Sequence, residues 1–301
     1  MTGKRILVTG GTGFIGQNLV EKLLASQNKI GLVVRNKPAA FSLFSSNVDY
    51  IESENNDNFT QEIVNFSPDI VIHLAAYSTS RDDLEAIEDL ITSNILFVSK
   101  LLDALRTTEL ELFINAASFS EYHANDEQLS PSYFYSATKT ASRFIIEYFS
   151  KINKFKFVNT ILYSVYGEKA ATKKVMDYII DSLDSPSSIK MTAGEQVLDF
   201  VHVNDVTDAY LALIEIAQTL GNEYQEYRIG TGQGTTIRQL ASLIENITDK
   251  KANISWGAVD YRARDTMYAV ANLERAKCDL KWAPKINIEL GIKQYLGYIV
   301  K

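Results

Sequence analysis

The chain has 301 residues, of which 46% are hydrophobic and 22% charged, an ordinary globular composition that is long enough for one large domain with an appended lobe. Its net charge of −7 and pI near 5.2 offer no broad basic surface, which counts against nucleic acid or an anionic membrane as the main partner. The single cysteine, Cys278, cannot form an internal disulfide, and no apolar stretch approaches the roughly 20 residues of a membrane span. Because the basic amino terminus runs into glycines, we expect a first strand, no signal peptide and a cytoplasmic location.

The first predicted elements surround a glycine-rich turn. An apolar run at 6–8 is followed by TGGTGFIG at 9–16 and by a helical stretch at 18–25. A buried strand, a glycine turn and a helix amino terminus together form a cradle for phosphate, because the helix dipole and free N–H groups attract anions. A bare turn is the alternative interpretation, but the flanking strand and helix favour a bound dinucleotide.

The next segments alternate between strands and helices. Apolar strands are expected at 30–34, 69–76, 112–115 and 157–162, with helices at 59–66, 84–105 and 136–151. This alternation predicts an α/β fold with a Rossmann-type, doubly wound parallel sheet.

Beyond Gly167 the alternation loosens. We expect a helix at 173–183, a strand at 200–203, a helix at 205–217 capped by its first residue, and a helix at 237–247 opened by Thr235 and Thr236. The predicted domains are a dinucleotide-binding domain at 1–166, to which 199–218 returns, and a smaller carboxyl-terminal α/β substrate lobe at 167–198 and 219–301. This lobe is expected to close over the carboxyl edge of the sheet, where ligands of such sheets bind.

Tyr135 and Lys139 lie four residues apart and therefore on one face of a predicted helix. An isolated tyrosine has a pKa near 10, and a neighbouring ammonium favours the phenolate and lowers that pKa. Tyr135 is thus a candidate acid–base group. The alternative is an amphipathic helix with a buried ring and an exposed lysine.

With these motifs, the chain resembles the extended short-chain dehydrogenase/reductase family of nucleotide-sugar enzymes, of the NAD-dependent epimerase/dehydratase type, over nearly its full length. Residues 9–16 match the family's TGxxGxxG, 73–76 its post-strand signature, and Tyr135 with Lys139 its YxxxK. Residues 199–205 resemble its DFxHVxD stretch.

The resemblance implies roles for individual residues. Lys139 would hydrogen-bond the nicotinamide ribose and lower the pKa of Tyr135, Tyr135 would pass a proton to or from a sugar oxygen, and Ser118 would hydrogen-bond that oxygen. No metal is implied. The cofactor would be bound by Thr9, Gly10, Thr12, Gly13, Phe14, Ile15, Gly16, Arg35, Leu74, Ala75, Ala76, Asn94, Tyr135 and Lys139. The substrate would be bound by Tyr122, Ser164 and Arg262.

Arg35 indicates which nicotinamide cofactor is used. It ends the second predicted strand, where a carboxylate would accept hydrogen bonds from the ribose 2′-hydroxyl of NAD and a cation would accommodate the extra phosphate of NADP. Asn36 and Lys37 follow, and no acidic residue lies there. We therefore favour NADP over NAD, with a solvated basic turn as the alternative interpretation.

The expected reaction is a reduction. Dehydratases of this family carry an acidic pair after the catalytic serine or threonine, whereas here Phe119 and Ser120 follow Ser118. The carboxyl half looks most like the CDP-4-keto-6-deoxyhexose 4-reductases, the CDP-paratose and CDP-abequose synthases. We thus expect NADPH-dependent reduction of the 4-keto group of a nucleoside-diphosphate 4-keto-6-deoxyhexose in deoxysugar biosynthesis. The alternatives are a nucleotide-sugar 4-epimerase with tightly bound NAD and a non-catalytic dinucleotide-binding redox sensor.

Two further expectations concern binding. Leu198 stands where many family members have an arginine that pairs with the substrate diphosphate, which leaves Arg262 as the best candidate, with Lys173 and Lys174 as possible helpers. The resemblance also suggests a homodimer packed through the helices at 84–105 and 136–151, although those apolar faces could equally belong to the core.

Overall fold

The computed structural model describes residues 3–54, 56–123, 128–167 and 173–298. Its larger sheet has seven strands, all parallel, in the order β10-β6-β5-β4-β1-β2-β3. The strands are β1 (Arg5–Thr9), β2 (Lys29–Val34), β3 (Asp49–Glu52), β4 (Ile70–His73), β5 (Leu112–Ser118), β6 (Lys156–Leu162) and β10 (Gln225–Ile229). The predicted doubly wound parallel sheet is confirmed.

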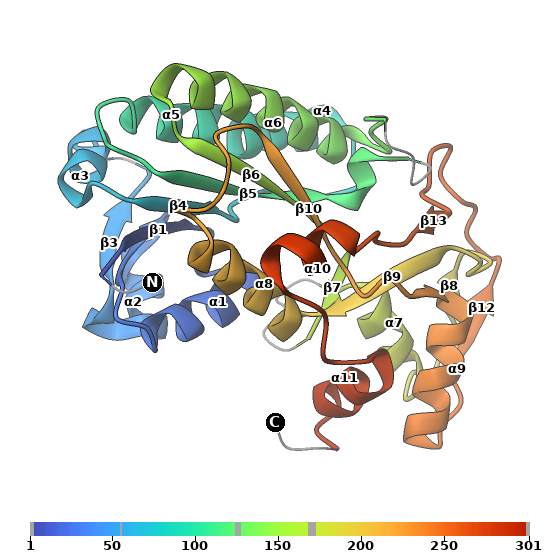
Figure 1. Ribbon diagram of the computed structural model, residues 1–301. Coiled ribbons are helices and arrows are strands. Elements are labelled where there is room, and N and C mark those ends of the chain that lie inside the picture. The colour runs from blue at the N-terminus through green and yellow to red at the C-terminus, as the bar shows by residue number, and fades with distance from the viewer. Residues whose placement is uncertain (1–2, 55, 124–127, 168–172, 299–301) are drawn as a thin grey trace.

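Helices cover both faces of this sheet (Figure 1). One face packs against α1 (Phe14–Leu24), α2 (Lys37–Phe44), α8 (Val203–Glu215) and α10 (Glu274–Leu280). The other packs against α3 (Phe59–Phe66), α5 (Phe97–Ala104) and α6 (Phe134–Asn153), with α4 (Leu84–Ile91) beside α6. Because both faces are covered, consecutive residues of a strand are buried, as at Ile6, Leu7 and Val8. This explains why the strands read as continuous apolar runs.

The long helix predicted at 84–105 is interrupted. Between α4 and α5, residues Thr92–Leu96 form a π-helical turn. Such turns are rare and often occur at functional sites. Here the turn contains Asn94, whose side chain is buried.

The smaller lobe is built around β9 (Val197–His202), which pairs with β7 (Ser164–Tyr166), β11 (Gly234–Thr236) and β13 (Tyr268–Ala269). A separate pair joins β8 (Ile189–Met191) to β12 (Ile254–Trp256). Helices α7 (Val175–Ser182), α9 (Ile237–Thr248) and α11 (Ile288–Tyr295) complete its core. Outside the lobe, two short 3-10 turns follow α2 and β5, at Ser45–Asn47 and Phe119–Glu121.

The structure differs from the prediction in the assignment of one segment to the lobe and in the start of one helix. The segment 219–301 was assigned to the lobe, but its strand β10 pairs with β6 at the edge of the larger sheet. The helix expected to begin at Asp205 begins at Val203, and the His202 ring caps it by accepting from the N–H of Asn204. The Asp205 carboxylate instead accepts from the backbone N–H groups of Lys285 and Ile286, so it ties the carboxyl-terminal segment to α8.

Within the described residues, no helix is long and apolar enough to cross a membrane. The same part of the chain holds no cluster of three or more His, Cys, Asp or Glu side chains arranged to bind a metal ion.

Candidate active site

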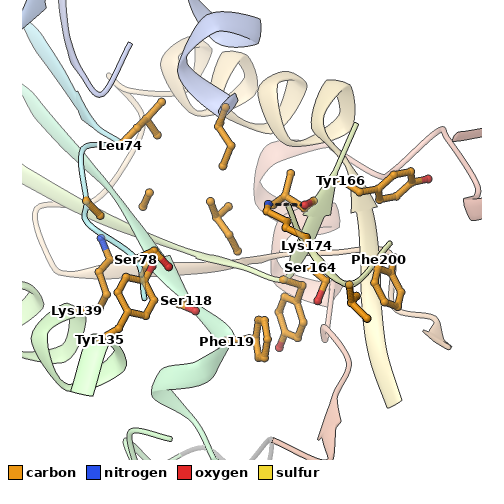
Figure 2. A pocket seen from close by; sticks show the side chains of 18 of the residues that line it. Leu74, Ser78, Ser118, Phe119, Tyr135, Lys139, Ser164, Tyr166, Lys174 and Phe200 are labelled. Atoms are coloured by element: carbon orange, nitrogen blue, oxygen red, sulfur yellow. Dashed lines mark hydrogen bonds between the residues drawn. The ribbon is translucent and has the colours of Figure 1, made fainter. Parts of the chain in front are cut away.

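A cavity of about 360 Å³ lies where the carboxyl ends of the larger sheet's strands face the lobe. Its walls come from the residues after β4, the ends of β5 and β6, the first turns of α6 and α7, and β9 (Figure 2). Most of the lining is aliphatic or aromatic, and a few polar groups project into it. Those groups are Ser78, Ser118, Tyr135, Lys139, Ser164 and Lys174.

The glycine turn at one end of the cavity has the shape that a bound diphosphate requires. Gly10 has φ +70°, and a Cβ there would lie 2.6 Å from the backbone nitrogen of Ala75. A Cβ on Gly16 would overlap the carbonyl oxygen of Gly10. At Gly13 an added Cβ would meet only that oxygen, at 3.2 Å, so the backbone stays open to a ligand. These features fit a dinucleotide whose diphosphate rests on the start of α1.

Thr9 and His73 hold the glycine turn against the loop after β4. The Thr9 hydroxyl lies 2.7 Å from His73 Nδ1 and accepts from the N–H of Ala75 at 3.2 Å. Burial, with a smaller effect from the charge of Lys139, lowers the pKa of His73 to about 3. The ring is therefore neutral at physiological pH and acts here as a fixed hydrogen-bonding group.

Asn94 organises the same loop from the π-helical turn. Its amide accepts from the N–H of Tyr77 at 2.8 Å and donates to the Tyr77 carbonyl and the Thr138 hydroxyl. These bonds fix the residues after β4, so Asn94 positions the cavity wall, and its predicted contact with the cofactor stays a prediction. Leu74 and Ala76, which precede Tyr77, line the cavity, as does Ile15 of the glycine turn.

Tyr135 and Lys139 lie one turn apart at the start of α6 and both face the cavity (Figure 2). Burial lowers the pKa of Lys139 to about 8, and Glu121 opposes that shift. Burial also raises the pKa of Tyr135 above its ordinary value, whereas a hydrogen bond with Ser78 lowers it. The phenol is therefore held in its neutral form, as a proton donor would be. The expected lowering of the Tyr135 pKa by Lys139 is therefore corrected: burial raises that pKa, and Lys139 is not among the groups that shift it.

Ser118 ends β5 at the cavity and belongs to a chain of hydroxyl groups. The Ser136 hydroxyl donates to that of Ser120 at 2.8 Å, and the Ser120 hydroxyl lies 2.8 Å from that of Ser118. If each hydroxyl donates to the next, the Ser118 proton stays available for an oxygen in the cavity. Ser118 is thus supported from behind by two buried serines.

Tyr122 does not reach the cavity. Its hydroxyl donates to Glu226 at 2.8 Å and accepts from Arg143 at 2.8 Å, in a cluster where Arg143 also pairs with the fully buried Glu121. None of these side chains lines the cavity, and Glu121 links the cluster to it by accepting from the N–H of Ser118 at 3.0 Å. The expectation that Tyr122 contacts substrate is therefore corrected: the nearby carboxylate and guanidinium draw its hydroxyl away.

Of the predicted binding residues Ser164, Arg262 and Arg35, one lines the cavity and two do not. Ser164 lines the cavity. Arg262 lies outside the cavity lining, where its guanidinium donates to the Ser80 hydroxyl at 2.8 Å, and its contact with substrate stays a prediction. Arg35 is exposed immediately after β2, and no hydrogen bond or ion pair joins its guanidinium to another described residue.

Several lining residues were not assigned to the site from the sequence, among them Ser78, Phe119 and Tyr163. Ser78 hydrogen-bonds Tyr135, and the rings of Phe119 and Tyr163 stack at 5.7 Å beside Ser118. A signal existed for each, since all three follow or end a strand whose carboxyl end forms the ligand edge of the sheet.

Comparison with known proteins identifies the family. The model of the NAD dependent epimerase/dehydratase family matches residues 6–230. The chain belongs to this family.

Curated relatives extend the match to nearly the whole chain. The CDP-abequose synthase of Salmonella typhimurium is 31% identical over 297 residues, covering 97% of both chains. The protein of the same name from Yersinia pseudotuberculosis is 30% identical, covering 92% of this chain and 96% of its own.

Solved structures of the family share the fold. The UDP-glucuronic acid 4-epimerase of Bacillus cereus, in complex with UDP-glucuronic acid and NAD, superposes with a TM-score of 0.85. That likeness covers 97% of this chain and 98% of the epimerase at 23% identity, which establishes the common architecture.

Proposed function

We propose that this chain reduces the 4-keto group of a nucleoside-diphosphate 4-keto-6-deoxyhexose with NADPH. The observation that carries the proposal is the convergence of Ser118, Tyr135 and Lys139 on one cavity beside a glycine turn shaped for a dinucleotide. Full-length similarity to CDP-abequose synthases supports a role in deoxysugar biosynthesis.

The chain's own residues supply binding and proton transfer. Tyr135, neutral because of its burial, donates a proton to the sugar oxygen as negative charge develops there. The Ser118 hydroxyl donates a hydrogen bond to the same oxygen and stabilises that charge. Lys139 orients the nicotinamide ribose, while residues 9–16 hold the diphosphate. When bound, the reduced cofactor provides the hydride.

The stacked pair Phe119 and Tyr163 supports a 6-deoxy sugar. In a hexose, C6 is attached to C5, the carbon next to C4, so it lies close to any group that holds the oxygen on C4. Both rings line the cavity directly beside Ser118. The faces of the two rings favour a methyl group, because they offer no hydrogen bond to a hydroxymethyl or carboxylate in its place.

The residues after Ser118 also argue against a dehydratase reaction. Phe119 and Ser120 occupy the positions of the family's acidic pair. The nearby carboxylate of Glu121 does not line the cavity, because it pairs with Arg143 and accepts from the N–H of Ser118.

Arg35 supports NADP as the cofactor. Its exposed guanidinium, free of ion pairs with described residues, is available to a 2′-phosphate. Arg35→Asp should weaken NADPH binding by about one to two orders of magnitude, since a charge-assisted hydrogen bond contributes about 1.5 to 3 kcal/mol. Tighter binding of NADH than NADPH by the unaltered protein would contradict the proposal for Arg35.

A 4-epimerase is the second candidate, because Ser118, Tyr135 and Lys139 also suit removal and return of hydride at C4. The deciding experiment incubates the protein with a panel of CDP- and UDP-linked sugars, giving NADPH with the 4-keto-6-deoxy sugars and NAD with the 4-hydroxy sugars. Stoichiometric loss of NADPH absorbance with a keto sugar supports the reductase. Interconversion of 4-hydroxy epimers without net reduction of NAD supports the epimerase instead.

A further inference from the structure

The charged lining of the cavity is confined to two lysines. Among the residues described as lining it, Lys139 and Lys174 are the basic ones, and no carboxylate joins them. They come from different parts of the fold, Lys139 from α6 and Lys174 from the residue before α7 (Figure 2). Lys139 lies beside the proton donor Tyr135 and belongs to the proposed mechanism. Lys174 has no role in that mechanism so far.

Lys174 extends from the lobe to the glycine turn. Its Nζ donates to the Val165 carbonyl oxygen at 2.8 Å and lies 4.8 Å from the centroid of the Phe14 ring. Phe14 is the first residue of α1, directly after the turn that is shaped for a diphosphate. An ammonium has three N–H donors, so two of those on Lys174 remain for a ligand.

The surroundings of this amine favour an anionic ligand. The residue is exposed, and the protein packed around its amine lowers the pKa to about 8, against an opposing effect of Asp177. An anion bound beside the amine favours its charged form.

The arginines near the cavity lie outside its described lining. Leu198 stands where an arginine was expected, and Arg262 donates to Ser80 outside the cavity lining. Arg264 donates to the Ser130 hydroxyl at 2.8 Å and also lies outside that lining. A diphosphate within the cavity therefore has Lys174 as its available counter-charge on the lobe side.

We propose that the Lys174 ammonium binds a diphosphate at the junction of the lobe and the glycine turn. The diphosphate belongs either to the dinucleotide or to the nucleotide sugar, and the second source rests on the proposed function. In both cases the lysine links the lobe to the dinucleotide-binding domain through the ligand.

The test compares Lys174→Gln with the matched control Lys173→Gln. Lys173 is the preceding residue and carries the same charge. The sequence suggested it as a second diphosphate contact, but in the structure it pairs with Asp181 outside the cavity lining, so it is not part of the proposed site. Dissociation constants are measured for NADPH by fluorescence titration and for CDP and UDP by calorimetry. Lys174→Gln should raise at least one of them ten-fold or more, less so at high salt. Lys173→Gln should stay within about two-fold of the unaltered protein, and Lys174→Arg within about five-fold, because it keeps the charge.

The ligand whose dissociation constant rises shows which diphosphate Lys174 binds. Weaker NADPH binding assigns the dinucleotide diphosphate, and weaker CDP or UDP binding assigns the nucleotide sugar. Unchanged constants in both arms, with an unchanged circular dichroism spectrum, would overturn the role of Lys174. Failure of the proposed function is a separate result: no turnover across the sugar panel, while the effect of Lys174→Gln on NADPH binding persists.

Discussion

The protonation states of Tyr135 and Lys139 suit a proton donor. Burial disfavours the charged form of each, raising the pKa of the phenol and lowering that of the amine to about 8. Tyr135→Phe should therefore lower turnover by about two to four orders of magnitude, the contribution of a positioned acid, and leave the NADPH dissociation constant nearly unchanged. Stopped-flow kinetics and fluorescence titration would measure both quantities.

Tyr133→Phe is the matched control for this prediction. Its ring stacks on that of Tyr135 with centroids 6.0 Å apart and also lines the cavity. Its hydroxyl is not assigned to proton transfer, so turnover should stay within a few-fold of the unaltered protein. Near-normal turnover in Tyr135→Phe would remove that residue from the mechanism.

His73 makes the fold sensitive to acid. Its pKa is about 3 in the folded chain and about 6.5 when unfolded, so the unfolded state binds more protons between these values. Stability is therefore lost as pH falls below about 6.5. From pH 7 to pH 5 this one group should lower the free energy of unfolding by about 2 kcal/mol.

Urea unfolding at both pH values, with His73→Gln beside the unaltered protein, checks this prediction. The variant has no imidazole to protonate, so its loss of stability from pH 7 to pH 5 should be smaller by about 2 kcal/mol. Equal losses in the two proteins would contradict it.

Which site residues could be predicted depended on how local their signal is. Tyr135 and Lys139 are four apart in one helix, and Ser118 ends a strand, so short patterns placed them at the cavity. The orientations of the Tyr122 and Arg262 side chains depend on partners that are far away in the sequence, which no short pattern reveals. The partner of Tyr122, Glu226, lies 104 positions away, and that of Arg262, Ser80, lies 182 positions away.

At the scale of elements, apolar runs predicted most of the larger sheet because its strands are buried on both faces. The edge strand β10, with the sequence QEYRI, lacks such a run and was missed. Strands β8, β12 and β13 of the lobe have only two or three residues, too few for a period to show. Helix α9, by contrast, begins after Thr236 as its capping pattern predicted.

The junction of β1 and α1 yields a prediction at this scale. Gly16→Ala places a methyl group against the Gly10 carbonyl oxygen, so the glycine turn must open. We expect NADPH binding to weaken at least ten-fold and the melting temperature to fall. Gly221→Ala is the control, because its added methyl would meet only Gln225 Nε2, at 3.7 Å. Tight NADPH binding by Gly16→Ala would show that close packing at this turn is dispensable.

At the scale of the whole molecule, α4, α6 and the π-helical turn between α4 and α5 carry exposed apolar side chains. The most exposed are Leu84, Ile91, Leu96, Phe144, Tyr148 and Ile152, which are 42% to 72% accessible. These helices form one outer side of the molecule (Figure 1). Exposed apolar side chains on neighbouring helices are typical of a subunit interface, so we predict a homodimer through these helices.

Analytical ultracentrifugation of Phe144→Glu tests the predicted dimer. A charge at the centre of an apolar interface opposes association, and the variant should sediment as a monomer at concentrations where the unaltered protein is dimeric. Leu43→Glu, on α2 and 48% exposed, is the control and should leave the assembly unchanged. A monomeric unaltered protein would contradict the prediction.

The position of β10 also determines how the chain can be divided. Residues 225–229 form β10, which returns from the lobe to pair with β6. Helix α8, which follows β9 and precedes β10 in the sequence, contacts α1 of the larger domain. A fragment ending at residue 166 would keep the glycine turn and the tyrosine–lysine pair but leave the buried strand β6 as an open edge. Open apolar edges pair with other chains, so this fragment should aggregate. The dinucleotide-binding half is therefore not an autonomous folding unit, and a minimal version of it must retain α8 and β10.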